Sequence, residues 1–454
     1  MRRLSPLVVA LAACGAPARS TPTAPVPVEA PTGPHASQVA AQVEPYLKGE
    51  VVDGVVVALV DADRTEIYGF ARDGQPRPGA ETVFDLGGVT QVFTALLLGD
   101  AVRRGELTLD APLAHHVPLG VQVPGDPPIT VGHLATHTSG LPPVPPSLLA
   151  KSVDPDPYAG YTAQAMYDDL ARARTAGAPG QQFVFSMFGY ALLGHALAHA
   201  AHTDWDRLVQ ARLLGPLGLR HTYTALPAAE APKVAPGHDP DLRPAPRWGP
   251  SAMGPAIAMS STAADLVAFA RANLDAAAGG KGALADVLRD GQEVAVRGGE
   301  TIRALAWFVD GDGRRWYNGG TGGHHVFVGF DPDKKQAVIV LADTSISLLD
   351  RLGGALFQVL AGDKPDPVRF PDAAALAALA GSYQLQGAPL TVEVKGARLY
   401  ASLPGDPATR LVPLSATEFW IEDAQAVVAF EMSAGKAARI HLLLGGQQVT
   451  AERQ

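Results

Sequence analysis

Residues 84–98 read FDLGGVTQVFTALLL, an apolar segment that meets two adjacent glycines and continues as a second apolar run. The pattern predicts a strand end that leads into a helix from Gly88 to about Arg104, with Gly105 at its end. Two glycines at such a corner allow the backbone to approach a neighbouring segment closely. The first N–H groups of the helix also lack partners within it. We therefore expect the rest of the chain to be arranged around this corner.

The flanking sequence predicts an α/β domain with an antiparallel sheet. A helix is expected over about 37–47, and the turn 61–64 joins two alternating segments into a hairpin. An amphipathic helix is expected over 163–176, and the spacing of ITVGHLATHTSGLP (129–142) suits a helix that ends at Gly140. In MSSTAADL (259–266), Ser260 and Ser261 are interpreted as helix caps. The expected strands are 55–60, 65–70, 302–309, 314–317, 325–330 and 337–341, and a closing helix is expected over about 346–360.

The C-terminal part has a different pattern. A Pro- and Asp-containing linker is expected over 363–373, and short alternating apolar segments follow from residue 374 to 454. Many short strands separated by turn residues indicate a small antiparallel β-barrel. The expected strands are 390–394, 399–402, 411–413, 419–422, 427–430, 440–444 and 448–451.

With these motifs the chain resembles the serine β-lactamase and penicillin-binding-protein superfamily, in particular class C β-lactamase-like hydrolases. The resemblance rests on FDLGGVTQ (84–91), ITVGHLATHTSGLP (129–142), GQQFVFSMFGYALLG (180–194) and YNGGTGG (317–323). It implies an antiparallel sheet flanked by helices with a helical subdomain over 37–362, followed by a lipocalin-like β-barrel over 374–454. The resemblance covers roughly residues 38–454.

The resemblance also implies where the catalytic side chains should stand. The family's Ser-x-x-Lys corresponds to Gly88 and Gln91, and its Tyr-x-Asn corresponds to Phe185 and Met187. The Lys or His of its third motif corresponds to Tyr317. None of these five residues supplies the family's nucleophile, base, proton shuttle or amide contact. The backbone N–H groups of Gly88 and Gly320 remain as a residual oxyanion hole.

Two hypotheses follow for function. The first is a catalytically inactive member of the family, a pseudoenzyme whose cleft binds a peptidoglycan-type peptide, a small molecule or a protein partner. The alternative is an esterase-, peptidase- or β-lactamase-like hydrolase with a non-standard nucleophile or a histidine-based site. Thr90 and Ser186 are expected to point away from the cleft. His324 and His325 follow the third motif, and both are candidates for lining the cleft beside Tyr317.

Two other sets of histidines have spacings that a metal site could use. His133 and His137 are four residues apart, and His195, His199 and His202 share one helix face. The second set has no acidic residue placed between its histidines as in the zinc-protease motif. We interpret the first pair as structural, as the resemblance implies, and the second set as a partly exposed stripe. No metal and no cofactor is expected.

The N-terminus predicts export. Met1 to Ala13 has the basic start and short apolar run of a signal peptide, and LAAC ends in Cys14, the only cysteine in the chain. We interpret Cys14 as a lipidation site, with ordinary cleavage after Ala18 as the alternative, and residues 14–36 as a Pro- and Ala-rich tether. A net charge of −9 without a basic stripe gives no basis for nucleic-acid binding. The sequence thus predicts a lipid-anchored protein of the bacterial cell envelope, facing the periplasm or the cell surface.

Overall fold

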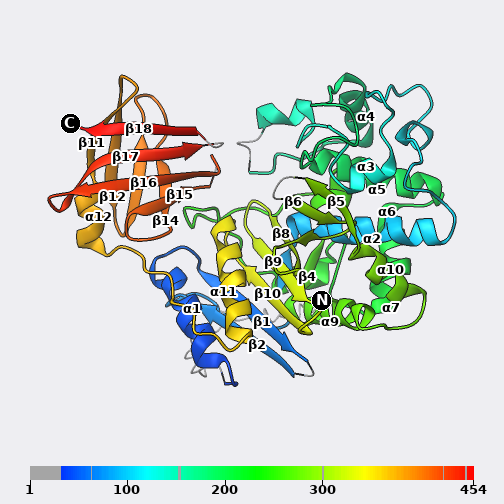
Figure 1. Ribbon diagram of the computed structural model, residues 1–454, viewed down its shortest axis with the longest axis horizontal. Helices are drawn as coiled ribbons and strands as arrows, with labels where there is room; N and C mark the ends of the chain where they lie inside the picture. The colour runs from blue at the N-terminus through cyan, green and yellow to red at the C-terminus, as the bar shows by residue number, and fades with distance from the viewer. Residues whose placement is uncertain (1–31, 63, 152–154, 299–300, 423, 445–446) are drawn as a thin grey trace, which may run out of the picture.

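The computed structural model describes residues 32–454 except 63, 152–154, 299–300, 423 and 445–446 (Figure 1). The predicted signal peptide, Cys14 and most of the tether lie outside the described residues. Figure 1 shows an α/β domain and, beside it, a β-barrel coloured orange to red. Within the described part of the chain, none of the helices is long and apolar enough to span a bilayer.

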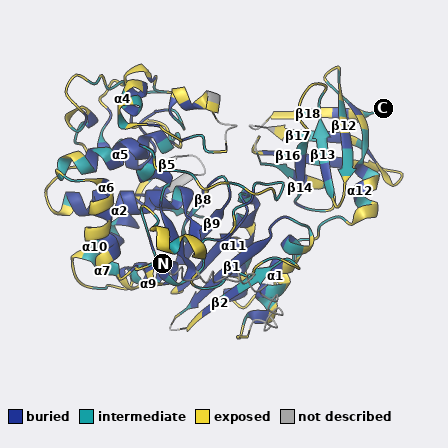
Figure 2. Ribbon diagram, turned by 180° about the vertical axis from the view of Figure 1, so that it is seen from behind, coloured by how far each residue is buried: buried dark blue, intermediate teal, exposed yellow. Residues whose placement is uncertain are grey.

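The first domain is built on an eight-stranded sheet in which each pair of neighbouring strands is antiparallel. Its strands in spatial order are β2 (Arg64–Ala71), β1 (Gly54–Asp61), β10 (Gln336–Ala342), β9 (His325–Asp331), β8 (Arg315–Gly320), β7 (Phe308–Val309), β6 (Thr301–Ala304) and β5 (Val294–Gly298). The strands β1, β9 and β10 are almost wholly buried (Figure 2). Their continuous apolar sequence follows from this position, because helices cover both faces.

The two faces of the sheet carry separate cores. Along β1, Val56 and Ala58 face one apolar cluster, and Val55 and Val57 face the other. On the second face lie α1 (Ala36–Lys48) and α11 (Asp350–Leu360). On the first face lie α9 (Ala263–Ala277) and α2 (Thr90–Arg103), with α3 (Val131–Ala135), α4 (Ala163–Arg172), α5 (Met187–Ala200), α6 (Trp205–Val209), α7 (Gly215–Leu217), α8 (Gly254–Ile257) and α10 (Ala283–Gly291) beyond them. This architecture confirms the predicted fold class.

Several boundaries differ from the sequence prediction. The helix expected to end at Gly140 is only α3, because His137 has a φ of +55° and cannot continue a right-handed helix. The segment predicted as one strand over 302–309 is divided into β6 and β7, which pair with each other. The closing helix begins at Asp350, after a short 3-10 turn.

The predicted caps at Ser260 and Ser261 are wrong by one or two residues. Both serines lie in the short strand β4 (Ser260–Thr262), which pairs with β3 (Val83–Asp85). Thr262 is the N-cap of α9, and its hydroxyl accepts a hydrogen bond from the Asp265 N–H at 3.2 Å. The capped helix start was thus predicted correctly, but the serines instead join the strand that leads into it.

The barrel is closed by eight strands, one more than the sequence indicated, since β11 was not predicted as a strand. Its strands are β11 (Gly381–Leu385), β12 (Ala388–Lys395), β13 (Arg398–Ser402), β14 (Thr409–Pro413), β15 (Glu418–Ile421), β16 (Ala426–Ser433), β17 (Lys436–Leu444) and β18 (Gln447–Arg453). The helix α12 (Ala373–Leu379) precedes them and packs at one end of the barrel. Closure pairs β18 with β11, so the sheet has no free edge.

The barrel is attached to the first domain by polar and apolar contacts. The Arg398 guanidinium donates to Glu50 at 2.9 Å, and Arg410 donates to the Glu50 backbone oxygen at 2.8 Å. The Ser347 hydroxyl donates to Glu422 at 3.0 Å. Val412 of β14 joins the apolar cluster on the α11 face of the sheet.

Candidate functional site

The glycine-rich corner packs directly against β8. The chain turns through the 3-10 segment Gly87–Val89 before α2 begins at Thr90, and Gly87 has a φ of +48°. A Cβ at Gly87 would lie 2.4 Å from the Gly320 carbonyl oxygen, and one at Gly319 would lie 2.1 Å from the Leu86 oxygen. The predicted close approach is therefore confirmed, and its partner is the backbone of β8.

Gly88 leaves little room for a larger residue. A Cβ at this position would be 3.0 Å from the Asn318 carbonyl oxygen and 3.8 Å from Tyr317 Cε1. The first contact is tighter than most Cβ contacts, so any side chain here requires a small shift of β8.

Gln91 and Tyr317 form a direct pair at the position where α2 faces β8. The Tyr317 hydroxyl donates to Gln91 Oε1 at 2.8 Å, and both side chains are buried. Within the described residues Gln91 Nε2 has no hydrogen-bond partner. Burial raises the pKa of Tyr317 far above its ordinary value, so the phenol stays protonated. Two residues that the sequence assigned to different motifs are thus joined by one buried hydrogen bond.

His137 lies beside this pair. Its Nδ1 accepts a hydrogen bond from the Ser186 N–H at 3.0 Å, which leaves the proton of the neutral ring on Nε2. Nε2 is 3.5 Å from the Tyr317 oxygen. Burial, together with the charge of Arg303, lowers the pKa of His137 well below its usual value. The ring is therefore neutral and held in one orientation.

Arg303 on β6 completes the cluster, and the sequence reasoning missed it. Its Nη2 donates to the Tyr190 hydroxyl at 2.6 Å, and its guanidinium carbon lies 4.7 Å from the Phe308 ring centroid and 5.1 Å from that of Tyr317. Arg303 is fully buried, and Nε and Nη1 have no hydrogen-bond partner among the described residues. The aromatic faces stabilise its charge. We call Gln91, His137, Tyr190, Arg303 and Tyr317 the central cluster.

Phe185 and Met187 border the central cluster. The Phe185 ring centroid is 4.6 Å from that of His137, and the side chain is 36% exposed. Met187 is the first residue of α5 and is partly buried against the first-face core. Between them, Ser186 caps α5, because its hydroxyl accepts from the Gly189 N–H at 2.9 Å and donates to the Pro142 oxygen at 2.7 Å. Apolar side chains therefore occupy both positions that the resemblance assigned to a polar pair.

Other hydroxyl groups near the corner are also engaged. Thr90 Oγ1 accepts from the Met259 N–H at 3.1 Å, and the side chain is fully buried. Ser260 Oγ donates to Asp85 at 2.8 Å, and Ser261 Oγ is 2.8 Å from Thr222 Oγ1. These hydroxyls stabilise the local backbone and face neighbouring protein atoms.

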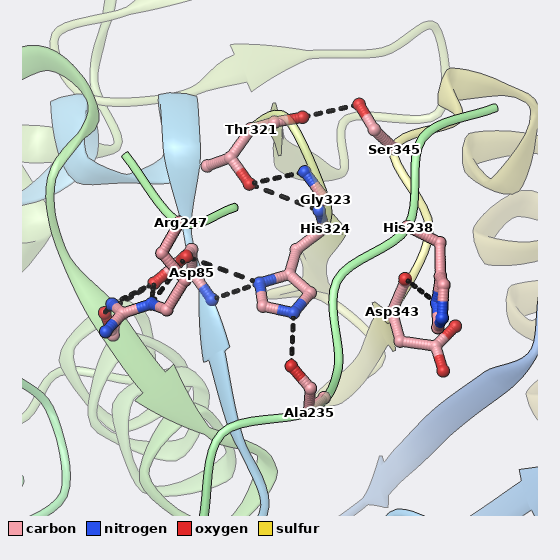
Figure 3. A network of polar contacts seen from close by, with 10 residues as sticks. Asp85, Ala235, His238, Arg247, Thr321, Gly323, His324, Asp343 and Ser345 are labelled. Carbon is pink, nitrogen blue, oxygen red and sulfur yellow. Dashed lines mark hydrogen bonds and ion pairs between the residues drawn. The ribbon is translucent and has the colours of Figure 1, made fainter. Parts of the chain in front are cut away.

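A polar network holds the entry to the corner (Figure 3). The Asp85 carboxylate accepts from Arg247 Nε at 3.0 Å, and the Asp85 N–H donates to His324 Nδ1 at 3.1 Å. The other nitrogen of His324 donates to the Ala235 oxygen at 3.0 Å. Burial alone would raise the pKa of Asp85, but the hydrogen bonds and the charge of Arg247 outweigh it and bring that pKa well below the usual range. His324 therefore anchors the loop before α2.

His325 lies on the other side of the sheet from Tyr317. In the β8–β9 register Tyr317 pairs with Val328, three residues from His325, so His325 occupies the opposite face. His325 Nε2 is 2.8 Å from Asp350 Oδ1 at the start of α11. The structure thus places neither candidate histidine next to the Tyr317 hydroxyl.

His133 and His195 have structural contacts, whereas His199 and His202 are exposed. The Thr130 N–H donates to His133 Nδ1 at 3.3 Å as part of the cap of α3. His195 Nε2 is 3.1 Å from the Ala252 oxygen, which a protonated nitrogen can reach as a donor. Among the residues that the structure describes, no group of three or more His, Cys, Asp or Glu side chains is placed to hold a metal ion.

The comparisons with known proteins agree on one family. The family model described as Beta-lactamase matches residues 39–362, most of the chain. A β-lactamase of Pseudomonas fluorescens is 27% identical over 52% of this chain and 64% of its own length. D-alanyl-D-alanine-carboxypeptidase/endopeptidase AmpH of Escherichia coli K12 is 29% identical over 43% of this chain and 54% of its own length. The matched regions thus cover less than two thirds of both relatives.

A longer match and the solved structures extend this comparison. Penicillin-binding protein 4 of Amycolatopsis lactamdurans is 29% identical over 68% of this chain and 86% of its own length. A solved class C β-lactamase superposes with a TM-score of 0.63 at 22% identity, over 72% of this chain and 95% of that one. The structural match supports the fold of the first domain.

Proposed function

Because this chain belongs to the β-lactamase family of serine hydrolases, we propose that it is a non-catalytic member of that family which acts as a binding or scaffold protein. The observation that carries the proposal is the hydrogen bond between Tyr317 and Gln91 inside a buried cluster. Two positions that would serve acyl transfer in the family here bind each other. A catalytic and a non-catalytic member of the family would share this fold, so the proposal rests on the chemistry of the site.

The chemistry of acyl transfer supports this view. Such a reaction needs a nucleophile next to a group that accepts its proton. Gly88 has no hydroxyl, and the amide of Gln91 is not a base. His137 is neutral, but its free lone pair on Nδ1 already accepts the Ser186 N–H. The hydroxyl groups of Thr90 and Ser186 are engaged in backbone contacts.

The central cluster also has a structural role. It joins α2, the segment after α3, α5, β6 and β8, which belong to distant parts of the sequence. Large side chains that pack in this way stabilise the domain through burial and dispersion. Supporting the arrangement of these elements is therefore the role we assign to the cluster.

For the ligand we propose a peptidoglycan-type peptide or a related small molecule. Two relatives support this ligand class, since one is named as a D-alanyl-D-alanine carboxypeptidase and another as a penicillin-binding protein. We also propose that Cys14 is lipidated and holds the protein at a membrane of the cell envelope. The ligand proposal rests on the family and the lipidation proposal on the N-terminal sequence. Binding of the ligand would proceed without a covalent intermediate.

Two assays test this function on the full-length chain. Hydrolysis of nitrocefin and of p-nitrophenyl acetate should not exceed that of a heat-inactivated sample, while purified peptidoglycan should retain the protein in a saturable way. Turnover above that control would contradict the non-catalytic role. If turnover occurred, its loss in His325→Ala or with a chelator would identify the histidine-based alternative. An absence of retention would remove the proposed ligand but leave the inactive site in place.

A further inference from the structure

The β-barrel contains a cavity at one end of its interior. Its volume is about 230 Å³, and its wall is mainly aliphatic. Most of this wall is formed by apolar side chains from six strands, namely Leu385, Leu390, Ala401, Ile421, Val428 and Leu442. Because alternate residues of a barrel strand face inward, this wall is the inner face of the barrel.

The opposite end of the barrel is filled. There Leu376 and Leu379 of α12 pack with Phe419 and Phe430 in one apolar cluster. The Tyr383 hydroxyl donates to the Leu379 oxygen at 2.6 Å, which fixes α12 against the first strand. The interior is therefore a cup with a packed base.

The open end is defined by the turns that join β11 to β12, β13 to β14 and β15 to β16. Asp406, Ser402 and Thr409 contribute polar atoms to the cavity wall at this end. Leu385 and Leu442 are only half-buried although they face inward, which indicates access from this end. Asp406, in the turn 403–408, is the one charged residue among the described residues that line the cavity.

We propose that this cup binds one unbranched hydrocarbon chain whose neutral or cationic head group stays at the acidic rim. An apolar cavity of ~150 Å³ is large enough for a benzene ring, so 230 Å³ holds roughly nine carbon atoms. Burial against aliphatic side chains favours binding of the hydrocarbon chain. The carboxylate of Asp406 at the rim disfavours an anionic head. This site is separate from the central cluster, and the proposal does not depend on the proposed function of the first domain.

The test is calorimetric titration of the full-length chain at low salt with nonylamine, 1-nonanol and nonanoate. We expect one bound molecule per chain for the amine and the alcohol, and binding of nonanoate that is weaker by a few-fold. Affinity for alcohols should rise by about fourfold per added CH₂ up to about nine carbons and then level off. A lack of saturable binding, or a preference for nonanoate, would overturn the proposal.

Variants locate the bound chain. Ala401→Phe places a ring inside the cup and should weaken binding by at least about tenfold. Ala429→Phe makes the same change on the outer face of β16 and should leave binding unchanged. Asp406→Asn alters only the exposed rim and should remove most of the difference between the amine and nonanoate. Unaltered binding in a folded Ala401→Phe variant, or an unaltered head-group preference in Asp406→Asn, would contradict the assignment.

Discussion

The central cluster and the barrel interior are both inner parts of this chain, but they are filled differently. In the first domain, Tyr317, Arg303 and their neighbours occupy the space between α2 and β8 with large side chains that contact one another. In the barrel, aliphatic side chains surround a cavity of about 230 Å³. The region in which the family places its chemistry is thus the packed one, and the region without a catalytic motif is the hollow one.

This difference bears on where the chain can bind small molecules. A packed cluster resists loss of volume, because its neighbours relax only partly around a cavity. By contrast, shortening a side chain that already faces a cavity should cost little stability. The comparison predicts that substitutions in the cluster mainly affect stability and substitutions in the cup mainly affect binding.

The largest expected effect is the difference in stability between the variants Tyr317→Ala and Leu442→Ala. The first substitution should lower the free energy of unfolding by about 3–5 kcal/mol, because it empties a packed site. The second should cost about 1 kcal/mol, because Leu442 is half-buried beside existing space. Urea unfolding of both variants measures this contrast. Equal costs would show that the two interiors do not differ as described.

A second effect concerns pH. Burial raises the pKa of Asp343 from 3.8 to about 6, although the Gly54 N–H and His238 act against the shift. The folded chain therefore keeps a proton that the unfolded chain releases, and the stability from Asp343 falls as pH rises from about 4 to about 6. The loss is about 3 kcal/mol. Urea unfolding across this range should show it as a difference between wild type and Asp343→Asn.

The loss of stability with rising pH should be confined to the first domain. Asp343 follows β10 in the first domain, so hydrogen exchange of peptides from residues 37–362 should follow the change. Peptides from the barrel should respond much less. A pH response confined to the barrel peptides would contradict this assignment.

Tyr317→Phe should have a smaller effect. Among the described residues Tyr317 is the one donor to Gln91 Oε1, so its loss leaves a buried acceptor unpaired, at a cost of about 1–2 kcal/mol. Adding Gln91→Leu should recover part of this loss, because neither polar group then remains. A double-mutant cycle measures the coupling, and additive effects would argue against the hydrogen bond.

The smallest effect is expected for Gly88→Ser. The new Cβ would approach the Asn318 oxygen, so a cost of about 1 kcal/mol is expected, with the same cost in Gly88→Ala as a matched control. The restored hydroxyl should not hydrolyse nitrocefin, because Gln91 cannot accept its proton. Turnover by the serine variant alone would show that another group acts as base.

The sequence predicted the glycine corner and the sheet because their signals are local. Gly87 and Gly88 follow an apolar strand, and β1, β9 and β10 are almost continuous apolar segments, whereas the edge strand β5 (Val294–Gly298) was not predicted. The length of the helix after Ile129 was not predictable in this way, since a positive φ at His137 depends on the loop that it joins. The first barrel strand was missed because Gly381–Leu385 carries little alternation.

The central cluster shows a second limit. Arg303 in a strand would ordinarily be expected at the surface. Its burial depends on Tyr190, which is 113 residues away, and on Phe308 and Tyr317. The correspondence of Gln91 to the family's Lys was visible only through the resemblance, whereas the pairing of Gln91 with Tyr317 required the structure. Long-range contacts of this kind leave no periodic signal in sequence.

Intact-protein mass spectrometry tests the central claim most directly. The full-length chain would be incubated with benzylpenicillin and, separately, with a fluorophosphonate, and a class C β-lactamase would serve as the positive control. If the site is non-catalytic, the mass of this chain should stay unchanged under conditions in which the control is acylated or phosphonylated. A stoichiometric adduct would contradict it, and peptide mapping would then identify the nucleophile.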